Sequence, residues 1–468
     1  MSENATSVER TVAGVILDLL WAAGVRTAFG IPGVHNLAFW NAAGPNRPRI
    51  VGVRHEQTTV YAADGLARAT GGLGVALTTT GPGAANTLGA FGEAAVSGSP
   101  VLVISSEAPI GKRDPEGTRG LLHEMDDQAS LFEPLAKQID EEILAVSVTT
   151  AEDAVFEALR LIQEVMQAPR GSGYLGIPAD ILEQPFEGEV PVAFDDLFLV
   201  AAPDVDDAIE ELESVQRIII WAGGGAVDNS SDVEKLSQHW NAPVLTTFAG
   251  RGIAAHSPNI VTAPIHEPEV ESLFANADAL VVIGSDLDGM NTKNWNLPWP
   301  SKIVVINIEP TVVLRNIEAT VVIDEARIHS VVESLINKTQ SRESWADVSA
   351  LNTKVRDRLR REEKSKRGIA LVEAIENSWP HDANIVCDMS VCGYWVGVYA
   401  NQNRSRRISY PVGWGTLGFG LPAAIGPAAQ GIRTLAVCGD GGVAFALGEL
   451  ATIAQEKLPY TLLIVDDG

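Results

Sequence analysis

Acidic residues directly follow two apolar stretches near the end of the chain, and they are the first candidates for chemistry. Asp440 follows one stretch, and Asp466-Asp467 follow the other. In a parallel α/β sheet, ligands bind outside the carboxyl ends of the strands, where carboxylate oxygens suit Mg²⁺ or Ca²⁺. Gly441 and Gly442 would let the backbone and the amino end of the next helix approach a phosphate. The same residue types also occur in plain turns, so this stretch alone does not define a site.

A second candidate is Glu56, which follows a short apolar run and precedes a helix-forming stretch rich in small residues, 59–68. A carboxylate at such a strand-to-helix junction can exchange a proton with a ligand. The helix dipole alone also favours an isolated glutamate at this place. Other parts of the chain must therefore decide between the two explanations.

Three α/β units are expected to position these residues. Helical stretches alternate with apolar runs in 1–185 and 195–337, and again in 368–468, with a charged linker helix predicted over 338–367. The alternation predicts three doubly wound parallel-sheet domains. A doubly wound domain would continue beyond its ligand-bearing strand, so the third domain is expected to be truncated at Gly468.

The composition narrows the class of protein. Thirty-four basic and sixty acidic residues give a net charge of −26, which argues against nucleic acid and anionic membranes as partners. The sequence has no apolar run long enough to cross a bilayer and no signal-peptide pattern at its start. Its three cysteines lack zinc-type spacing and fit a reducing compartment. A cytoplasmic protein is expected.

Five motifs then specify the family. In chain order they are Gly30-Ile31-Pro32-Gly33, Arg54-His55-Glu56-Gln57, Thr80-Gly81-Pro82-Gly83-Ala84-Ala85-Asn86, Gly415-Thr416-Leu417-Gly418-Phe419-Gly420 and Gly439-Asp440-Gly441-Gly442. This order resembles the acetolactate synthase-like thiamin diphosphate enzymes, which include pyruvate oxidases and 2-oxo acid decarboxylases, and the resemblance covers the whole chain. It implies pyrimidine-binding, central and diphosphate-binding domains. One departure is that Asp466-Asp467 stand where the family has two asparagines.

The resemblance implies decarboxylation or carboligation of a 2-oxo acid, with thiamin diphosphate and Mg²⁺ as cofactors. Glu56 would hydrogen-bond N1′ of the aminopyrimidine, and Leu417 would prop the cofactor into its bent form. Asp440 and Asp467 would hold the metal. The other residues expected at the cofactor are Pro32, Gly33, Asn86, Ser390, Cys392, Gly415, Gly439, Gly441 and Gly442, together with Asp440.

Members of this family share each active site between subunits. The pyrimidine-binding domain of one chain faces the diphosphate-binding domain of another. The resemblance therefore implies a homodimer or homotetramer, in which Glu56 and Asp440 of one site belong to different chains.

Two substitutions bear on the substrate. His123 replaces a glutamine of acetolactate synthases and is a catalytic candidate, as an acid or base or as a group that recognises a carboxylate. A loop hydrogen bond without catalysis explains His123 equally well. Glu107 also stands where glutamine is common. Both changes argue against assuming pyruvate as the substrate.

The central domain raises the question of FAD, which true acetolactate synthases bind there. Gly223-Gly224-Gly225 lacks the Gly-x-Gly-x-x-Gly spacing of a dinucleotide site, and the stretch Gly284-Ser285-Asp286 has an acid where those enzymes carry arginine. The sequence thus argues against FAD. Two alternatives remain open: a flavin-linked 2-oxo acid oxidoreductase, and a non-catalytic homologue that binds cofactor.

Overall fold

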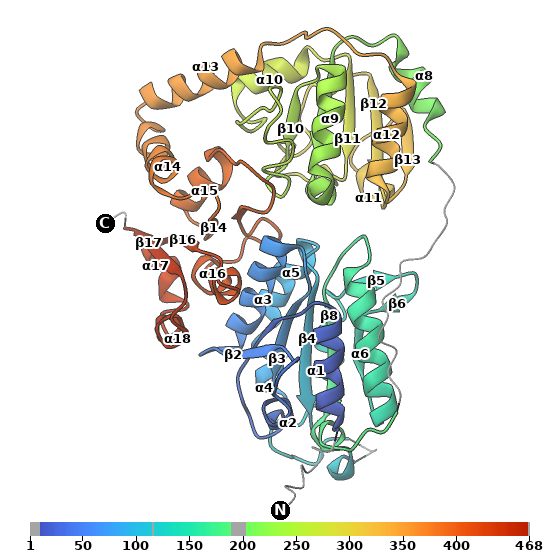
Figure 1. The fold of residues 1–468 in the computed structure, drawn as a ribbon, viewed down its shortest axis with the longest axis vertical. Coiled ribbons are helices and arrows are strands. Elements are labelled where there is room, and N and C mark those ends of the chain that lie inside the picture. The colour runs from blue at the N-terminus through green and yellow to red at the C-terminus, as the bar shows by residue number, and fades with distance from the viewer. Residues whose placement is uncertain (1–9, 115–116, 189–202, 467–468) are drawn as a thin grey trace, which may run out of the picture. The chain divides into compact units, whose positions relative to one another are not determined.

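The computed structural model describes residues 10–114, 117–188 and 203–466, which carry the elements labelled in Figure 1. Contacts divide the chain into two compact units. One unit contains the N-terminal domain together with Gly413–Ala436 and Asp440–Ile464. The other contains the central domain and the chain up to Val412, with Val437–Gly439.

Six strands form the parallel sheet of the N-terminal domain. Their order is β2 (Arg49–Gly52), β1 (Thr27–Gly30), β3 (Gly74–Thr78), β4 (Val101–Glu107), β8 (Gly173–Pro178) and β7 (Ala145–Ser147). The helices are α1 (Val12–Ala22), α2 (Leu37–Asn41), α3 (Glu56–Thr70), α4 (Pro82–Ala85), α5 (Leu88–Val96), α6 (Ala151–Met166) and α7 (Ala179–Leu182). A small antiparallel pair, β5 (Gln138–Ile139) and β6 (Glu142–Ile143), lies outside this sheet.

Helices cover both faces of the N-terminal sheet. Helices α1 and α6 share one apolar core with the strands, whereas α3 and α5 pack on each other and on β3 and β4. All residues of β1, β3, β4 and β8 are buried, as parallel strands between two helical layers require.

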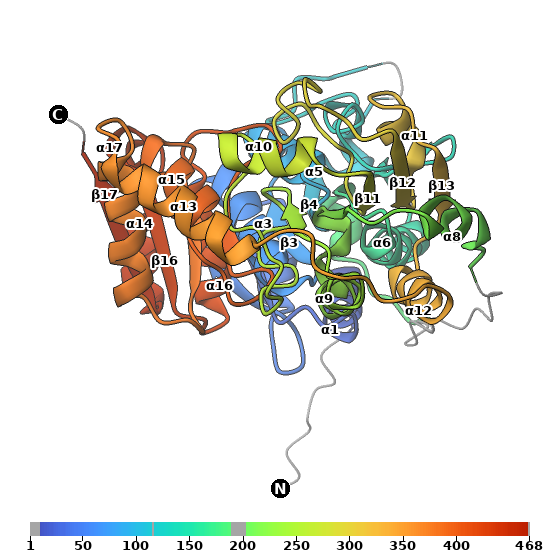
Figure 2. The ribbon, with the colours of Figure 1, turned by 90° about the horizontal axis from the view of Figure 1, so that it is seen from above.

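The central domain repeats this architecture with five parallel strands. Their order is β10 (Val244–Thr246), β9 (Ile218–Ala222), β11 (Ala279–Ile283), β12 (Lys302–Asn307) and β13 (Val321–Asp324). The helices are α8 (Asp206–Glu213), α9 (Ser230–Trp240), α10 (Pro268–Ala275), α11 (Pro310–Leu314) and α12 (Ile328–Lys338). Seen from above in Figure 2, α9 and α12 lie on one side of the strands, and α10 and α11 lie on the other.

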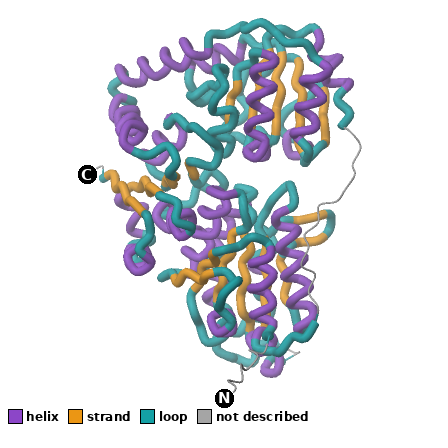
Figure 3. The backbone as a smooth tube through the Cα atoms, viewed as in Figure 1, coloured by secondary structure: helices purple, strands orange, loops and turns teal. Residues whose placement is uncertain are grey.

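The third sheet contains four strands. Their order is β15 (Ile408–Ser409), β14 (Asn384–Cys387), β16 (Thr434–Gly439) and β17 (Tyr460–Val465). The accompanying helices are α13 (Val348–Arg361), α14 (Lys366–Ser378), α15 (Val391–Tyr399), α16 (Gly420–Ala429), α17 (Asp440–Ala444) and α18 (Glu449–Glu456). The secondary structure in Figure 3 alternates between helix and strand along all three regions, so the predicted α/β class with parallel sheets is confirmed.

The charged segment 338–367 differs from the single helix predicted for it. Helix α13 occupies only Val348–Arg361, and residues 340–347 are not helical. The side chain of Asp347 accepts a hydrogen bond from the Ala350 N–H and begins α13. Before it, the indole of Trp345 donates to the carbonyl of Ile218 and holds the segment against β9. The predicted helix over 338–367 is therefore shorter in the structure, and the residues just before α13 are held by this tertiary contact.

Candidate active site

Glu56 is the first residue of α3, just after the turn that follows β2. Nδ1 of His55 accepts a hydrogen bond from the Gln57 N–H and caps the helix, so the carboxylate is fixed in the first turn. Asn86 Nδ2 donates to Glu56 Oε2 at 3.1 Å. Among the described residues, none donates a hydrogen bond to Oε1, and the side chain is partly exposed. The predicted strand-to-helix junction is confirmed, and one carboxylate oxygen can accept a ligand.

The loop that follows β3 lies beside Glu56. A Cβ on Gly83 would lie 3.9 Å from Glu56 Oε1 and 2.6 Å from Thr79 Cγ2. A Cβ on Gly33 would lie 2.7 Å from Thr79 Oγ1. Thr79 therefore packs between Gly33 and Gly83, and a side chain at either glycine would push against it. The sequence reasoning missed Thr79, whose only signal is its position at the end of an apolar run.

His123 approaches the same loop. A Cβ on Gly81 would lie 2.6 Å from the carbonyl oxygen of His123. The exposed His123 has a φ of +67°, and its ring lies 6.0 Å from that of His35, edge to face. Burial, together with His123 and Lys112, lowers the pKa of His35. The structure thus brings His123 to the loop beside Glu56, and its catalytic role stays a prediction.

Glu107 is engaged inside the N-terminal domain. Arg113 Nη2 donates to its Oε2 at 2.8 Å, and Ser147 Oγ donates to its Oε1 at 2.5 Å. The side chain is buried. Glu107 therefore joins the loop after β4 to β7, and both of its carboxylate oxygens accept hydrogen bonds from within the domain.

Gly415 and Leu417 lie in the loop that precedes α16. The φ angles of Gly415 and Gly418 are +72° and +77°, in the region that favours glycine. Between these two glycines, the Leu417 side chain is 54% exposed. A Cβ on Gly418 would lie 2.6 Å from Cβ of Phe445, another exposed apolar residue. The loop thus presents Leu417 where a cofactor or a second chain can cover it.

Asp440, Gly441 and Gly442 begin α17 directly after β16. Asp440 is exposed. Among the described residues outside its own helix and its chain neighbours, none places a heavy atom within 4 Å of the position that a Cβ on Gly441 would take, so a ligand can approach the backbone there. The predicted strand-to-helix turn is therefore confirmed.

Ser390 and Cys392 lie together at the start of α15. Ser390 caps the helix by accepting a hydrogen bond from the Gly393 N–H at 3.2 Å, and its Oγ lies 3.1 Å from Cys392 Sγ. A Cβ on Gly439 would lie 3.4 Å from Ser390 Cβ, so these residues form one group with Gly439. Burial raises the pKa of the Cys392 thiol, which keeps the thiol protonated at neutral pH.

The metal ligands are only partly described. Within the described residues, no three His, Cys, Asp or Glu side chains gather as a metal site. Asp440 is one of the two predicted ligands, and Asp467 lies outside the described residues. Carboxylates beside a diphosphate supply the hard oxygen donors that Mg²⁺ takes, so the residue types fit the metal.

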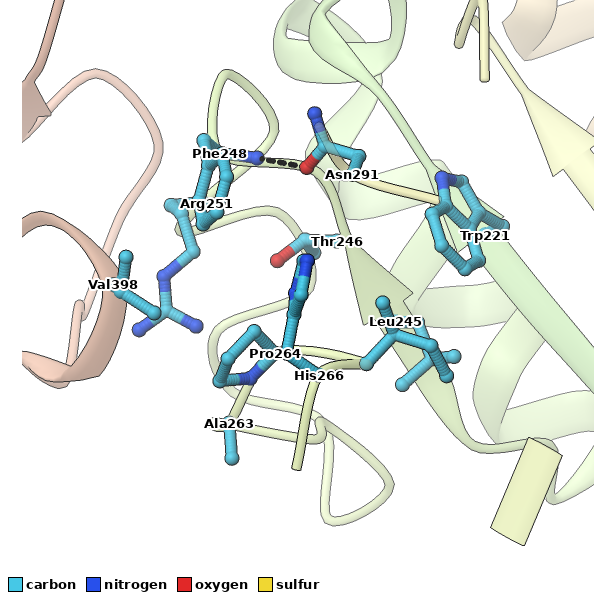
Figure 4. Close-up of a pocket in the computed structure, with 11 residues that line it drawn as sticks. Trp221, Leu245, Thr246, Phe248, Arg251, Ala263, Pro264, His266, Asn291 and Val398 are labelled. Carbon is cyan, nitrogen blue, oxygen red and sulfur yellow. Dashed lines mark hydrogen bonds between the residues drawn. The ribbon is translucent and has the colours of Figure 1, made fainter. Parts of the chain in front are cut away.

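A narrow pocket lies at the carboxyl end of β10 in the central domain (Figure 4). Its lining contains none of the predicted site residues. Arg251 lines it, is half-buried, and donates to the carbonyls of Thr262 and Ala400 at 2.9 and 2.8 Å. Burial lowers the pKa of Arg251 to about 10, so the side chain remains charged at neutral pH. These contacts make Arg251 a clamp between two loops.

Two of the three consecutive glycines, Gly223 and Gly225, pack closely against the turn at Gly284. A Cβ on Gly223 would lie 2.3 Å from the carbonyl oxygen of Gly284, and one on Gly225 would lie 3.0 Å from Gly284 Cα. The absence of side chains at Gly223 and Gly225 thus allows the segment after β9 to approach the segment after β11 closely. The absence of FAD stays a prediction.

Comparison with known proteins agrees with this arrangement. Family models match the thiamine pyrophosphate enzyme N-terminal TPP binding domain over residues 10–131, the central domain over 205–335 and the C-terminal TPP binding domain over 388–468. A probable 2-ketoarginine decarboxylase of Pseudomonas aeruginosa is 30% identical, over 97% of this chain and 81% of that protein. A probable acetolactate synthase large subunit of Methanocaldococcus jannaschii is 26% identical, over 97% and 80%.

Parallel α/β domains in this order define a thiamine pyrophosphate-dependent enzyme of the decarboxylase and carboligase class. The chain belongs to the acetolactate synthase-like family of these enzymes, and that prediction is confirmed. The comparisons do not favour the flavin-linked oxidoreductase or the non-catalytic homologue. In the part of the chain that the structure describes, no helix is long and apolar enough to span a membrane.

Proposed function

We propose that the protein decarboxylates a 2-oxo acid with thiamin diphosphate and Mg²⁺ and releases an aldehyde or joins the product to a second carbonyl compound. The position of Glu56 carries this proposal. Its Oε2 is held by Asn86, whereas its Oε1 can exchange a proton with N1′ of the aminopyrimidine. When bound, thiamin diphosphate supplies the electron sink for loss of CO₂.

The remaining roles follow from the geometry around each group. Leu417 would pack against the cofactor from its exposed position in the 413–418 loop. The backbone of Gly439, Asp440, Gly441 and Gly442, with Ser390 and Cys392 beside it, would receive the diphosphate. Asp440 and Asp467 would hold Mg²⁺ through their carboxylate oxygens.

The panel of candidate substrates should include 2-oxo acids whose side chains differ in charge. The relatives include a protein named 2-ketoarginine decarboxylase and several named acetolactate synthases, so pyruvate and a 2-oxo acid with a guanidinium tail are the two reference compounds. His123 lies beside the loop that borders Glu56 and would face the substrate as an acid, a base or a carboxylate-binding group.

Reconstitution tests the proposal. The purified protein is supplied with thiamin diphosphate and Mg²⁺, and CO₂ release is followed over a panel of 2-oxo acids. The Asp440→Ala variant loses a metal ligand. It is expected to need about 100-fold more Mg²⁺ for half-maximal activity, the upper end of the range for weakened metal sites. Cofactor binding without CO₂ release from any compound of the panel would contradict the proposed activity.

The shared active site adds a second test. Trp414, Leu417, Phe445, Leu447 and Leu450 expose apolar side chains in one unit, which is typical of a surface that another chain covers. At a Mg²⁺ concentration that saturates only the wild type, Glu56→Gln and Asp440→Ala chains should each have little activity alone, and they are expected to regain activity when they are mixed and exchanged. No recovery in a confirmed mixed dimer would show that each site draws both residues from one chain.

A further inference from the structure

Two buried carboxylates each bind the backbone of a segment far away in the sequence. Glu93 on α5 has no exposed surface, and Glu449 on α18 is 1% exposed. A carboxylate is costly to bury unless hydrogen bonds satisfy its oxygens. Both side chains meet this condition through backbone N–H groups that flank proposed cofactor-binding or catalytic residues.

Glu93 holds the loop that contains Gly415 and Leu417. Its Oε1 accepts a hydrogen bond from the Gly413 N–H at 3.1 Å. Its Oε2 accepts from the N–H groups of Trp414 at 3.0 Å and Thr416 at 3.3 Å. Three backbone amides within four residues therefore converge on one carboxylate, and they fix the backbone on both sides of Gly415.

A neighbouring arginine balances the charge of Glu93. Arg68 Nη2 donates to Glu93 Oε1 at 3.1 Å, and the same guanidinium binds both carboxylate oxygens of Asp64 at 2.8 Å. Burial raises the pKa of Glu93, but Arg68 and the N–H groups of Trp414 and Thr416 outweigh burial and hold it below its usual value. Glu93 is therefore ionised at neutral pH and can accept every one of these hydrogen bonds.

Glu449 holds the turn that leads into Glu56. Its Oε1 accepts hydrogen bonds from the N–H groups of Arg54 at 2.9 Å and His55 at 3.1 Å. Its Oε2 accepts from Thr452 Oγ1 at 2.7 Å. The two amides belong to the residues directly before Glu56, so Glu449 fixes the point from which α3 begins.

We propose that Glu93 and Glu449 are reciprocal positioning residues that hold the Gly415–Leu417 loop and the Glu56 turn in place for the cofactor. The inference rests on the proposed function for its consequence in catalysis, although the contacts themselves do not depend on it. Glu93 extends from the N-terminal domain to the loop before α16, and Glu449 extends from α18 to the N-terminal domain. Glu449 accepts from backbone amides of the opposite segment, whereas Glu93 accepts from three backbone amides and also from Thr416 Oγ1 at 3.3 Å.

Hydrogen exchange of the full-length protein tests the positioning directly. In Glu93→Gln, the amides of Gly413, Trp414 and Thr416 are expected to exchange about tenfold faster, the factor for losing one hydrogen bond to a charged group. In Glu449→Gln, the amides of Arg54 and His55 are expected to change by a similar factor. Each substitution should affect its own segment much more than the other. Unchanged exchange at both segments would overturn the proposal.

Asp64→Asn is the matched control. Asp64 is as fully buried as Glu93 and pairs with the same Arg68, but no hydrogen bond joins it to the 413–416 loop among the described contacts. The control should lower the melting temperature while exchange in the loop stays near that of the wild type. If hydrogen exchange in the loop became equally fast in Asp64→Asn and Glu93→Gln, Glu93 would have only a general structural role, and the proposal would be overturned.

Cofactor affinity gives the functional readout. Half-saturation with thiamin diphosphate, measured by calorimetry, is expected to require about tenfold more cofactor in each glutamine variant, and Glu93→Asp should recover part of the loss because it keeps the charge. Faster exchange with unchanged affinity would overturn the link to the cofactor. If the wild type binds no thiamin diphosphate, the proposed function fails, and the exchange result still decides whether the carboxylates position their loops.

Discussion

The N-terminal and central domains share a parallel α/β architecture but use their charged side chains differently. In the unit that contains the N-terminal domain, buried Glu93 accepts hydrogen bonds from backbone amides of a distant loop. In the unit that contains the central domain, Arg358 on α13 donates to Glu269 on α10 at 3.0 Å and also binds the neighbouring Glu267. The first arrangement fixes a backbone conformation, whereas the second joins one side chain to others.

The difference shows what each kind of contact can achieve. A carboxylate that accepts from several amides in a row determines the course of that loop, which suits residues that must meet a cofactor. A cluster of side-chain ion pairs holds two helices together and tolerates small movements of both. We therefore expect damage in the first region to affect catalysis and damage in the second to affect stability.

The largest effect is expected at Glu56, the carboxylate that the first region positions. Glu56→Gln keeps the size of the side chain and removes its proton exchange, so CO₂ release should fall about a thousandfold. Calorimetry should show that thiamin diphosphate still binds. Glu157→Gln, on α6 and paired with Arg160, is a control that should leave turnover unchanged. Full turnover in Glu56→Gln would contradict the expectation that damage in the first region affects catalysis.

A smaller effect, on stability, is expected from Arg358. Its side chain and that of Glu269 are 25% and 10% exposed, so Arg358→Met leaves a largely buried carboxylate without its partner. We expect a loss of about 2 kcal/mol in the free energy of unfolding, less than for a fully buried pair because solvent reaches the cluster. Urea denaturation measures this loss, and turnover per folded molecule should be unchanged.

Arg360 provides the control for that experiment. It lies on the same helix, but its side chain is 50% exposed and pairs with Asp357 and Glu373 at the surface. Such exposed pairs contribute about 0.5 kcal/mol each, so Arg360→Met should change stability little. If Arg358→Met reduced turnover as strongly as it reduced stability, the central domain would contribute to catalysis as well.

The sequence predicted what depends on local patterns. Apolar runs such as 101–105 and 279–284 predicted β4 and β11, because buried parallel strands are continuously apolar. The position of Glu56 between an apolar run and a helix predicted the junction that the structure shows. The order of the motifs predicted the family, which the comparisons confirm.

The contacts between distant segments could not be predicted in this way. Glu93 lies among small residues of an ordinary helical stretch, and its partners Gly413, Trp414 and Thr416 are more than 300 positions later. No local spacing indicates such a pairing, because it depends on how α5 and the loop pack. Thr79 was missed for the same reason, since only the folded loops show that two glycines enclose it.

The smallest expected effect is the pH dependence of the Glu93 contribution to stability. The folded protein lowers the pKa of Glu93 below its usual value of about 4.3, so the unfolded chain binds the proton more readily. The contribution is therefore fully present above about pH 5 and is lost as the pH falls through the lowered pKa. Urea denaturation of the wild type and Glu93→Gln should differ by about 1 kcal/mol at pH 7, and the difference should shrink below about pH 4. A difference that stays constant down to pH 3 would mean that the charge of Glu93 contributes nothing, and that its hydrogen bonds to the loop work as well through a neutral amide.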